Sequence, residues 1–369
     1  MSVKQKVAIL KSRLYRGGVA QVLGFMISDL NKKGIIPDIL VLRSDLTPSD
    51  FKRLYNLEIE FKIRIIGPDL KMPYEWHFLY FNLLTRGYAA KYDLFINSNN
   101  TSFLSSRKIK TITYDHFPRK FRVISANNSI HFPEKMDKHF FDIKYDPFYL
   151  ARLIYRFNKS YGNNEVLIAN SNFTAQKMRE SYFSVSDVEI LYPPVPISAV
   201  NLNEKKAQVV SLGRISDEKR QLEQLEIASF LPEVPFYILG FSNTDEYFRK
   251  CEKVIYEKKL SNVFLLPNLP LDEINRILSE SLIFLHNVRN EPFGIGIVQA
   301  ATNNCIPVIH GSGGATEIIT NKELYFTTVE EATSIIKKIK KGEIKFTFSN
   351  KFSPENFSKQ FNEVLDSIQ

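Results

Sequence analysis

The chain has 369 residues, of which 44% are hydrophobic and 24% are charged, and its formal net charge is +9. This balance is typical of a soluble globular protein, and the length is sufficient for two domains. No apolar run reaches the roughly 18 to 20 residues that cross a bilayer, and the N-terminus has no apolar signal core. We therefore expect a cytoplasmic protein without a transmembrane helix.

The use of cysteine and histidine excludes two further classes of protein. Cys251 and Cys305 are the only cysteines, which is too few for a small disulfide-rich scaffold. None of the six histidines lies in a recognised metal-binding motif, and the chain has no Asp-x-Asp motif. We predict that the protein requires no metal ion or other cofactor.

Positive charge is concentrated in the first half of the chain. Residues 1–200 contain 29 Lys and Arg against 18 Asp and Glu, whereas residues 201–369 contain 20 against 22. A basic surface suits nucleic acid, anionic lipid headgroups or phosphorylated substrates, and charge alone does not choose among them.

Short β-rich runs alternate with amphipathic stretches along most of the chain, which predicts parallel sheets covered by helices. The first series is Val7–Leu10, Ile39–Leu42, Ile63–Ile66, Leu94–Asn97, Ile109–Tyr114, Val166–Ala169 and Val188–Leu191. The second series is Val209–Leu212, Pro235–Leu239, Val263–Leu266, Leu282–Leu285 and Pro307–Ile309.

A proline-rich and polar stretch separates the two series. Three prolines between residues 193 and 196 precede the polar run 201–206, and both features disfavour regular structure. Near the end of the chain, Ser353 and Pro354 have the positions of an N-cap and a first helical residue. We expect domains at 1–200 and 201–352, followed by a terminal helix at 353–369.

The most informative stretch is the segment from Asn290 to Ala300, which follows an apolar strand and includes Pro292 and two glycines. Pro292 suits the first turn of a helix, and the glycines allow a ligand to approach the unpaired amides at the helix N-terminus. Such an end attracts phosphate or sugar oxygens. Glu291 would lie at its mouth, and Gln299 would project from the second or third turn.

This segment resembles the E-x7-E signature of the retaining glycosyltransferases of family 4, which have the GT-B fold of two Rossmann-like domains. In the second half, two further blocks resemble this family: 209–220, its phosphate-binding block, and 311–317, its late glycine loop. In the first half, four segments match its landmarks in order: 16–20, 114–118, 169–174 and 191–194. The motifs are most similar to the α-1,2-mannosyltransferases that extend lipid-linked oligosaccharides.

The resemblance implies a donor site for a nucleotide-sugar in the second domain and a terminal helix that crosses back to the first. Arg214 and Lys219 follow a strand of the second domain and lie at the start of a helix that we expect through residues 217–225. They would hold the donor diphosphate, whose charge grows as the sugar bond breaks. Glu291 would contact the transferred sugar, and the amides of Phe293, Gly294 and Ile295 would hold donor oxygens. The family is thought to use the departing phosphate as base, without a covalent nucleophile.

The chain departs from the signature at one position, because residue 299 is Gln where the family usually has Glu. The resemblance places this side chain at the nucleotide ribose. A neutral amide oxygen accepts a weaker hydrogen bond than a carboxylate does, so the substitution affects donor affinity more than chemistry. A solvated basic loop and a helix-dipole acid remain the structural alternatives for Lys219 and Glu291 respectively.

Four more residues are candidates for the site. His116 follows a strand of the first domain and matches the family's interdomain histidine, which implies a catalytic role, and His286 ends a strand of the second domain. Gly17 and Gly18 precede a helical pattern and would bring backbone amides close to the donor phosphate or the acceptor. Each histidine could instead be structural.

An aromatic stretch from Trp76 to Leu84 has basic residues on its flanks, as interfacial helices do. Core helices have the same composition, so both interpretations stay open. A second such stretch spans residues 148–156. Either could bring the basic half to an anionic membrane.

Together these features predict a retaining hexosyltransferase that uses a GDP- or UDP-hexose, with mannose favoured, and a lipid-linked or other glycan acceptor at the cytosolic membrane face. One alternative is an enzyme of the same fold that acts on a soluble acceptor or a surface polymer. The other is a basic nucleic-acid-binding protein or an inactive partner subunit, although we expect no nucleic acid partner.

Overall fold

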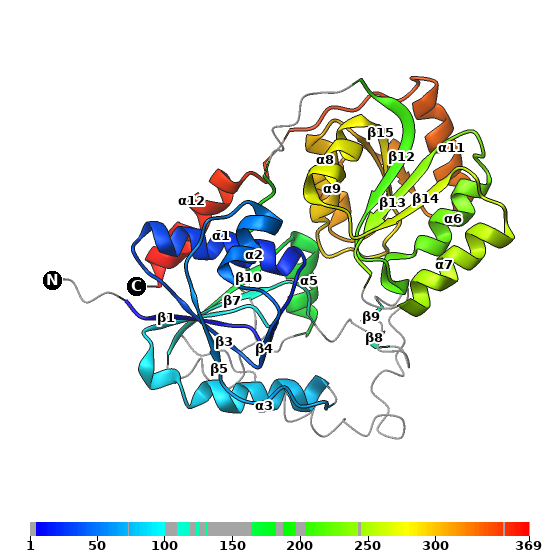
Figure 1. The fold of residues 1–369 in the computed structure, drawn as a ribbon. Helices are drawn as coiled ribbons and strands as arrows, with labels where there is room; N and C mark the ends of the chain where they lie inside the picture. The colour runs from blue at the N-terminus through cyan, green and yellow to red at the C-terminus, as the bar shows by residue number, and fades with distance from the viewer. Residues whose placement is uncertain are drawn as a thin grey trace. The chain divides into compact units, whose positions relative to one another are not determined.

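The computed structural model describes residues 5–72, 74–99, 109–118, 123–124, 130–131, 164–181, 187–196, 204–242, 245–349 and 351–368. The chain divides into two compact units. The N-terminal unit contains residues 1–121, 135–194 and 354–369, and the C-terminal unit contains residues 122–134 and 195–353. Each unit has a parallel sheet with helices around it (Figure 1), which confirms the expected α/β class.

The described part of the N-terminal unit has a seven-stranded sheet in the order β11-β10-β7-β6-β1-β3-β5. Its strands are β1 (Val7–Leu10), β3 (Asp38–Val41), β5 (Lys62–Ile65), β6 (Leu94–Asn97), β7 (Lys110–Asp115), β10 (Glu165–Ala169) and β11 (Glu189–Ile190). Its helices are α1 (Gly18–Lys32), α2 (Pro48–Tyr55), α3 (Tyr74–Arg86), η1 (Ala89–Lys91), α5 (Asn172–Ser181) and α12 (Pro354–Ser367). The strands β2 (Arg13–Leu14) and β4 (Arg43–Ser44) form a separate, short parallel sheet.

The described part of the C-terminal unit has a six-stranded parallel sheet in the order β14-β13-β12-β15-β16-β17. Its strands are β12 (Lys206–Leu212), β13 (Phe236–Gly240), β14 (Val263–Pro267), β15 (Ser281–His286), β16 (Ile306–His310) and β17 (Tyr325–Phe326). Its helices are η5 (Asp217–Lys219), α6 (Gln221–Ser229), α7 (Asp245–Glu257), α8 (Leu271–Glu280), α9 (Ile295–Thr302), α10 (Ala315–Ile318), η6 (Lys322–Leu324) and α11 (Val329–Lys340). An antiparallel pair, β8 (Val123–Ile124) and β9 (Ile130–His131), is grouped with this unit.

Burial on both faces explains the strand compositions. Every residue of β1 and β6 is buried, as expected for parallel strands covered by helices on both sides. The helix α1 buries one stripe of its surface against the sheet, and α12 packs against α1. Phe361 of α12 is fully buried, and the ammonium of Lys33 lies 3.1 Å from the carboxylate of Asp366. The last helix of the chain therefore belongs to the N-terminal unit.

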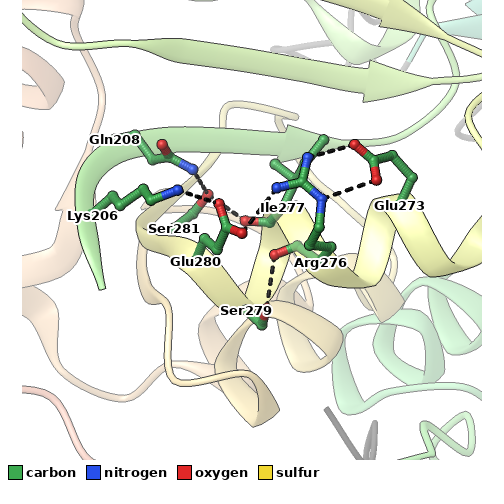
Figure 2. A network of polar contacts seen from close by, with 8 residues as sticks. All are labelled: Lys206, Gln208, Glu273, Arg276, Ile277, Ser279, Glu280 and Ser281. Carbon is green, nitrogen blue, oxygen red and sulfur yellow. Dashed lines mark hydrogen bonds and ion pairs between the residues drawn. The ribbon is translucent and has the colours of Figure 1, made fainter. Parts of the chain in front are cut away.

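A polar network on the surface of the C-terminal unit joins α8 to the start of β12 (Figure 2). Arg276 contacts Glu273 and Glu280 on its own helix, and Glu280 accepts a 2.6 Å bond from the Lys206 ammonium. The Lys206 side chain is 60% exposed, so water screens this ion pair strongly.

The predicted strands all overlap strands of the structure, and the terminal helix begins at Pro354 as predicted. Two helix predictions were wrong. The helix expected through residues 217–225 is interrupted at Arg220, which has a left-handed backbone with φ of 55°. Pro292 does not lie in the first turn of α9, because Gly294, with φ of 111°, caps that helix and Ile295 is its first residue.

Candidate functional site

The strand order of the C-terminal sheet fixes where a ligand can bind. Successive strands extend from β12 to one side, through β13 and β14, and then from β15 to the other. Ligands of open α/β sheets bind beyond the carboxyl ends of the strands where the order reverses, which here is between β12 and β15. A small pocket lies at this point, and it is lined by Ser211, Leu212, Gly213, Lys219, Gln221, Gln224, Leu285, His286 and Val288.

Three of the predicted site residues meet beside this pocket. The Lys219 ammonium donates a 2.8 Å hydrogen bond to Glu291 Oε2, and His286 Nε2 lies 3.3 Å from the same oxygen. The side chains of Lys219, Glu291 and His286 are 23%, 12% and 9% exposed. The structure therefore brings together residues from two segments that are far apart in the sequence: Lys219 from one, and His286 and Glu291 from the other.

The Lys219–Glu291 pair is charged on both sides. Burial opposes ionisation of Glu291, but Lys219 and His286 outweigh it and hold the pKa of this carboxyl well below its usual range. Burial likewise lowers the pKa of the Lys219 ammonium, and the charges of Glu291 and Glu218 more than reverse this, so its pKa is raised. Loss of either partner would leave the other charge buried without compensation.

Arg214 supplies a second cation at the same edge. Its guanidinium lies over the ring of Phe241, 5.5 Å from the centroid, and its Nε is buried with no hydrogen-bond partner. It forms no ion pair with the described residues, and it is close enough that its charge opposes protonation of Lys219. Two cations near the same strand ends disfavour each other's charge, so an anion that binds close to both would be stabilised.

A glycine loop positions Glu291. The backbone of Glu291 forms a parallel bridge with Gly313, and the Gly314 amide donates a 2.7 Å bond to the Glu291 carbonyl. Gly313 has φ of 74°, and a Cβ atom there would lie 2.6 Å from the Glu291 carbonyl oxygen. The loop 311–314 is therefore glycine-rich because the backbone that carries Glu291 passes directly against it.

A short polar chain fixes the residue before Glu291. The Asn290 amide donates a 2.8 Å bond to Ser312 Oγ, and this hydroxyl lies 2.8 Å from His310 Nδ1. Burial and the charges of Arg289, Arg220 and His286 lower the pKa of His310 to about 4. The imidazole is therefore neutral at pH 7, and its Nδ1 can accept the Ser312 hydroxyl proton.

A buried polar layer supports the end of β15, and no sequence motif indicates it. Gln224 accepts a 2.8 Å bond from Ser211 Oγ and donates a 2.8 Å bond to Asn287 Oδ1. Asn287 in turn donates a 2.9 Å bond to the Arg220 carbonyl. These side chains connect β12, α6 and β15 beneath the pocket. Asn287 directly follows the strand end, but no motif separates it from an ordinary loop residue.

The residues of the predicted donor-binding segment 293–299 differ in how much of each can face a ligand. The side chain of Phe293 is buried and packs edge-on against Phe352, with ring centroids 5.2 Å apart, so only its backbone can face a ligand. Gly294 and Ile295 form the N-terminal end of α9, whose first amides have no partner within the helix. Gln299 is half-buried in the second turn, and its side-chain amide has no hydrogen-bond partner among the described residues.

The remaining candidates belong to the N-terminal unit. His116 follows β7 and is largely buried, and its Nε2 lies 2.9 Å from Ser98 Oγ. The Gly17 amide donates a 2.9 Å hydrogen bond to the Tyr55 hydroxyl oxygen, and this hydroxyl donates a 3.0 Å hydrogen bond to the Gly17 carbonyl. Gly18 is the exposed first residue of α1. Ser98 and Tyr55 are partners that sequence reasoning missed.

No cluster of three His, Cys, Asp or Glu side chains in the described ranges could hold a metal ion. In the same part of the chain, no helix has the length and apolar character needed to cross a membrane.

Comparisons with known proteins identify relatives of part of the chain. Residues 197–366 match the family model described as Glycosyl transferases group 1. The chain is 29% identical over 188 residues to the GDP-Man:Man(3)GlcNAc(2)-PP-Dol alpha-1,2-mannosyltransferase of Xenopus laevis, which covers 45% of this chain and 38% of that protein. It is 24% identical over 262 residues to the protein of the same name from Dictyostelium discoideum, covering 59% and 52%. The matches thus span about half or less of these relatives.

Solved structures resemble the whole chain. Anabaena Alr3699/HepE in complex with UDP and glucose superposes with a TM-score of 0.71 at 16% identity, covering 98% of this chain and 100% of that one. WaaG, a glycosyltransferase involved in lipopolysaccharide biosynthesis, gives a TM-score of 0.68 at 13% identity, covering 98% and 95%. At these identities the likeness shows the fold alone, and it confirms the expected GT-B fold.

The low pKa of His310 predicts how stability depends on pH. An unfolded histidine titrates near 6.5, whereas His310 resists protonation down to about 4. Between these values the unfolded chain binds more protons, so stability should fall as the pH drops. Allowing for the partial exposure of the ring, we expect a loss of about 1 kcal/mol between pH 7 and pH 5.

Denaturant unfolding of the wild type and of His310→Asn at both pH values measures this contribution. Asn keeps a polar atom near Ser312 but does not titrate. The variant should lose about 1 kcal/mol less than the wild type over this interval. Equal losses in the two proteins would show that His310 does not resist protonation.

Proposed function

We propose that the protein is a retaining glycosyltransferase, because residues 197–366 match the family model of group 1 of the glycosyl transferases and the chain has the GT-B fold. It moves a hexose, with mannose favoured, from a nucleotide-sugar to a lipid-linked or other glycan acceptor. The observation that carries this proposal is the cluster of Lys219, Glu291 and His286 at the reversal of the strand order, beside Arg214, which forms no ion pair with the described residues.

The chemistry of sugar transfer accounts for each charge in the cluster. As the bond to the sugar breaks, negative charge accumulates on the leaving diphosphate. Arg214 and Lys219 stabilise that charge, and they do so without a required metal ion. The Lys219 ammonium has three N–H groups, so it can hold Glu291 and bind a phosphate oxygen at the same time.

Glu291 serves the transferred sugar in this proposal. Its carboxylate stays ionised because of Lys219 and His286, and an ionised carboxylate accepts strong hydrogen bonds from sugar hydroxyls. The amides of Gly294 and Ile295 bind donor oxygens at the positive end of α9. The protein thus contributes positioning and electrostatics, while the departing phosphate acts as base for the acceptor hydroxyl.

The names of the matched relatives support the choice of mannose and of a lipid-linked acceptor. Those relatives are GDP-mannose-dependent enzymes that extend a dolichol-linked oligosaccharide, as their names state. We propose the same classes of donor and acceptor for this chain, with UDP-hexose as the alternative donor. A basic first half suits an acceptor that carries a diphosphate, presented at the cytosolic face of a membrane.

Transfer assays with GDP-mannose, UDP-glucose and related donors test the proposal, with the Glu291→Gln variant as the key comparison. Glu291→Gln keeps the side-chain size and removes the charge. We expect its kcat to fall by about 100-fold or more, with little change in the affinity for free nucleotide. Near-normal turnover would show that Glu291 has only a structural role, as an acid at the positive end of the helix. Failure of every donor to bind would reject the proposed function.

Lys219→Met should weaken binding of the free nucleoside diphosphate by about tenfold or more, because it removes a charge-assisted bond of roughly 1.5 to 3 kcal/mol. Lys206→Met is the matched control. It also breaks a lysine–glutamate ion pair in the same unit, but on the surface network of α8 (Figure 2), so calorimetry should find unchanged affinity.

A double variant separates direct contact from indirect repulsion. Lys219→Met leaves the Glu291 charge uncompensated near the phosphates, and this charge alone could weaken binding. In Lys219→Met/Glu291→Gln that repulsion is gone. A persistent loss of affinity shows that Lys219 contacts the diphosphate, whereas restored affinity shows that it acts only through Glu291.

Gln299→Glu should tighten donor binding by a few-fold to tenfold, because a carboxylate accepts a ribose hydroxyl proton more strongly than an amide does. The measurement compares the nucleotide with its 2′,3′-dideoxy analogue in both proteins. Equal discrimination by the wild type and the variant would show that residue 299 does not contact the ribose.

A further inference from the structure

The helix α3 has one ordinary buried face. Figure 1 shows it in cyan along the N-terminal sheet. Phe78 and Phe81 are 5% and 2% exposed, and Phe81 packs in a core cluster with residues of β1, β3 and β6. Asn82 and Thr85 are also buried on this side, so the inward face contains polar as well as apolar side chains.

The opposite face of α3 is unusual because it is apolar although it is exposed. Trp76 and Leu83 are 46% and 54% exposed, and Leu79 between them is half-buried. A spacing of three, four and seven residues places these three side chains on one helical stripe. A surface helix of a globular protein normally presents charged or polar residues there. Leu70, shortly before the helix, adds another exposed apolar side chain, at 43%.

The charged residues around this stripe are mainly basic. Lys71, Arg86 and Lys91 are exposed, and Lys91 lies over the ring of Tyr88 at 4.7 Å from its centroid. Arg86 falls on the same stripe as Leu83, one turn further along. Between residues 70 and 92 the sequence has a single acidic residue, Glu75. Apolar side chains with basic neighbours are the combination that binds an anionic membrane surface.

We propose that the outward stripe of α3, formed by Trp76, Leu79 and Leu83 with Arg86, is the surface by which this protein docks on an anionic lipid bilayer. The apolar side chains enter the headgroup region, and the basic side chains bind lipid phosphates. A second copy of the chain fits this surface poorly, because a two-fold contact would place the same basic residues against one another.

The inference rests on the proposed function only in that a lipid-linked acceptor has to be met at a membrane. The stripe and its charges belong entirely to the N-terminal unit, whereas the proposed donor site belongs to the C-terminal unit. Membrane docking and donor chemistry can therefore be measured separately, and either can fail alone.

The sequence supplies its own reporter, because Trp76 is the only tryptophan in the chain. The full-length protein is mixed with vesicles of phosphatidylcholine and phosphatidylserine, and with vesicles of phosphatidylcholine alone. On the anionic vesicles, Trp76 emission should shift to the blue, and brominated acyl chains should quench it. Raised salt should reduce binding, since the basic side chains contribute through a screened interaction.

Leu83→Ser should lower the affinity for anionic vesicles by about tenfold in sedimentation assays, because it removes a large apolar group from the contact. Phe230→Ser is the matched control, since Phe230 is 53% exposed but lies at the end of α6 in the C-terminal unit. The control should bind vesicles as the wild type does. Neither variant should change nucleotide affinity, which also verifies that each protein is folded.

Three outcomes would overturn the inference. The first is vesicle binding that neither shifts nor quenches Trp76, since contact would then occur elsewhere. The second is no binding to anionic vesicles even at low salt. The third is a shift of Trp76 emission that depends on protein concentration without vesicles, which would assign the stripe to self-association. If vesicles bind as expected while no nucleotide-sugar binds, the proposed function fails and the docking surface stands.

Discussion

The candidate site depends on one buried ion pair, Lys219 with Glu291. Burial favours the neutral form of both groups, and the charge of each partner stabilises the charge of the other against this effect. His286, whose Nε2 lies 3.3 Å from Glu291 Oε2, also stabilises the Glu291 carboxylate. Much of the surrounding architecture holds these groups in place: the strand ends of β12 and β15, the glycine loop and the polar layer of Gln224 and Asn287. A buried pair of this kind is costly to desolvate, so it suits a functional role better than a purely stabilising one.

The parallel sheet explains how distant segments converge on this pair. Lys219 lies beyond β12, His286 ends β15, and Glu291 follows on the loop toward α9. Parallel strands all end at the same edge of a sheet, so residues that follow them meet there whatever their separation in sequence. The glycine loop beyond β16 then makes contact with the backbone of Glu291 from the other side. The site therefore depends on the edge of the parallel sheet, where these segments meet, as well as on the side chains themselves.

Much of this arrangement was predictable from the sequence, and the reasons differ between its parts. The strands were found because fully buried parallel strands form continuous apolar runs, as in β6 and β15. The grouping of Lys219, Glu291 and His286 followed from motif order and strand ends. The hydrogen bond from the Asn290 amide to Ser312 Oγ was not predictable, because it depends on loop conformations that place residues 22 positions apart in contact. The glycines at 311–314 were interpreted from family resemblance, whereas the structure shows Gly313 and Gly314 packed against backbone. The sequence also suggested one helix through 217–225, since no residue type there marks the left-handed backbone of Arg220.

That left-handed residue, Arg220, decides which acid Lys219 meets. In an uninterrupted helix, Lys219 and Glu223 would stand four residues apart on one face and would form the ordinary pair of such positions. The interruption separates them. Glu223 instead accepts bonds from Arg220 itself, at 2.6 Å and 3.0 Å, and Lys219 is left to Glu291. The backbone conformation of Arg220 thus determines whether Lys219 pairs with the nearby Glu223 or with the distant Glu291. A continuous helix through this turn would be locally more stable, but it would weaken the site, because Lys219 would pair with Glu223 instead of Glu291.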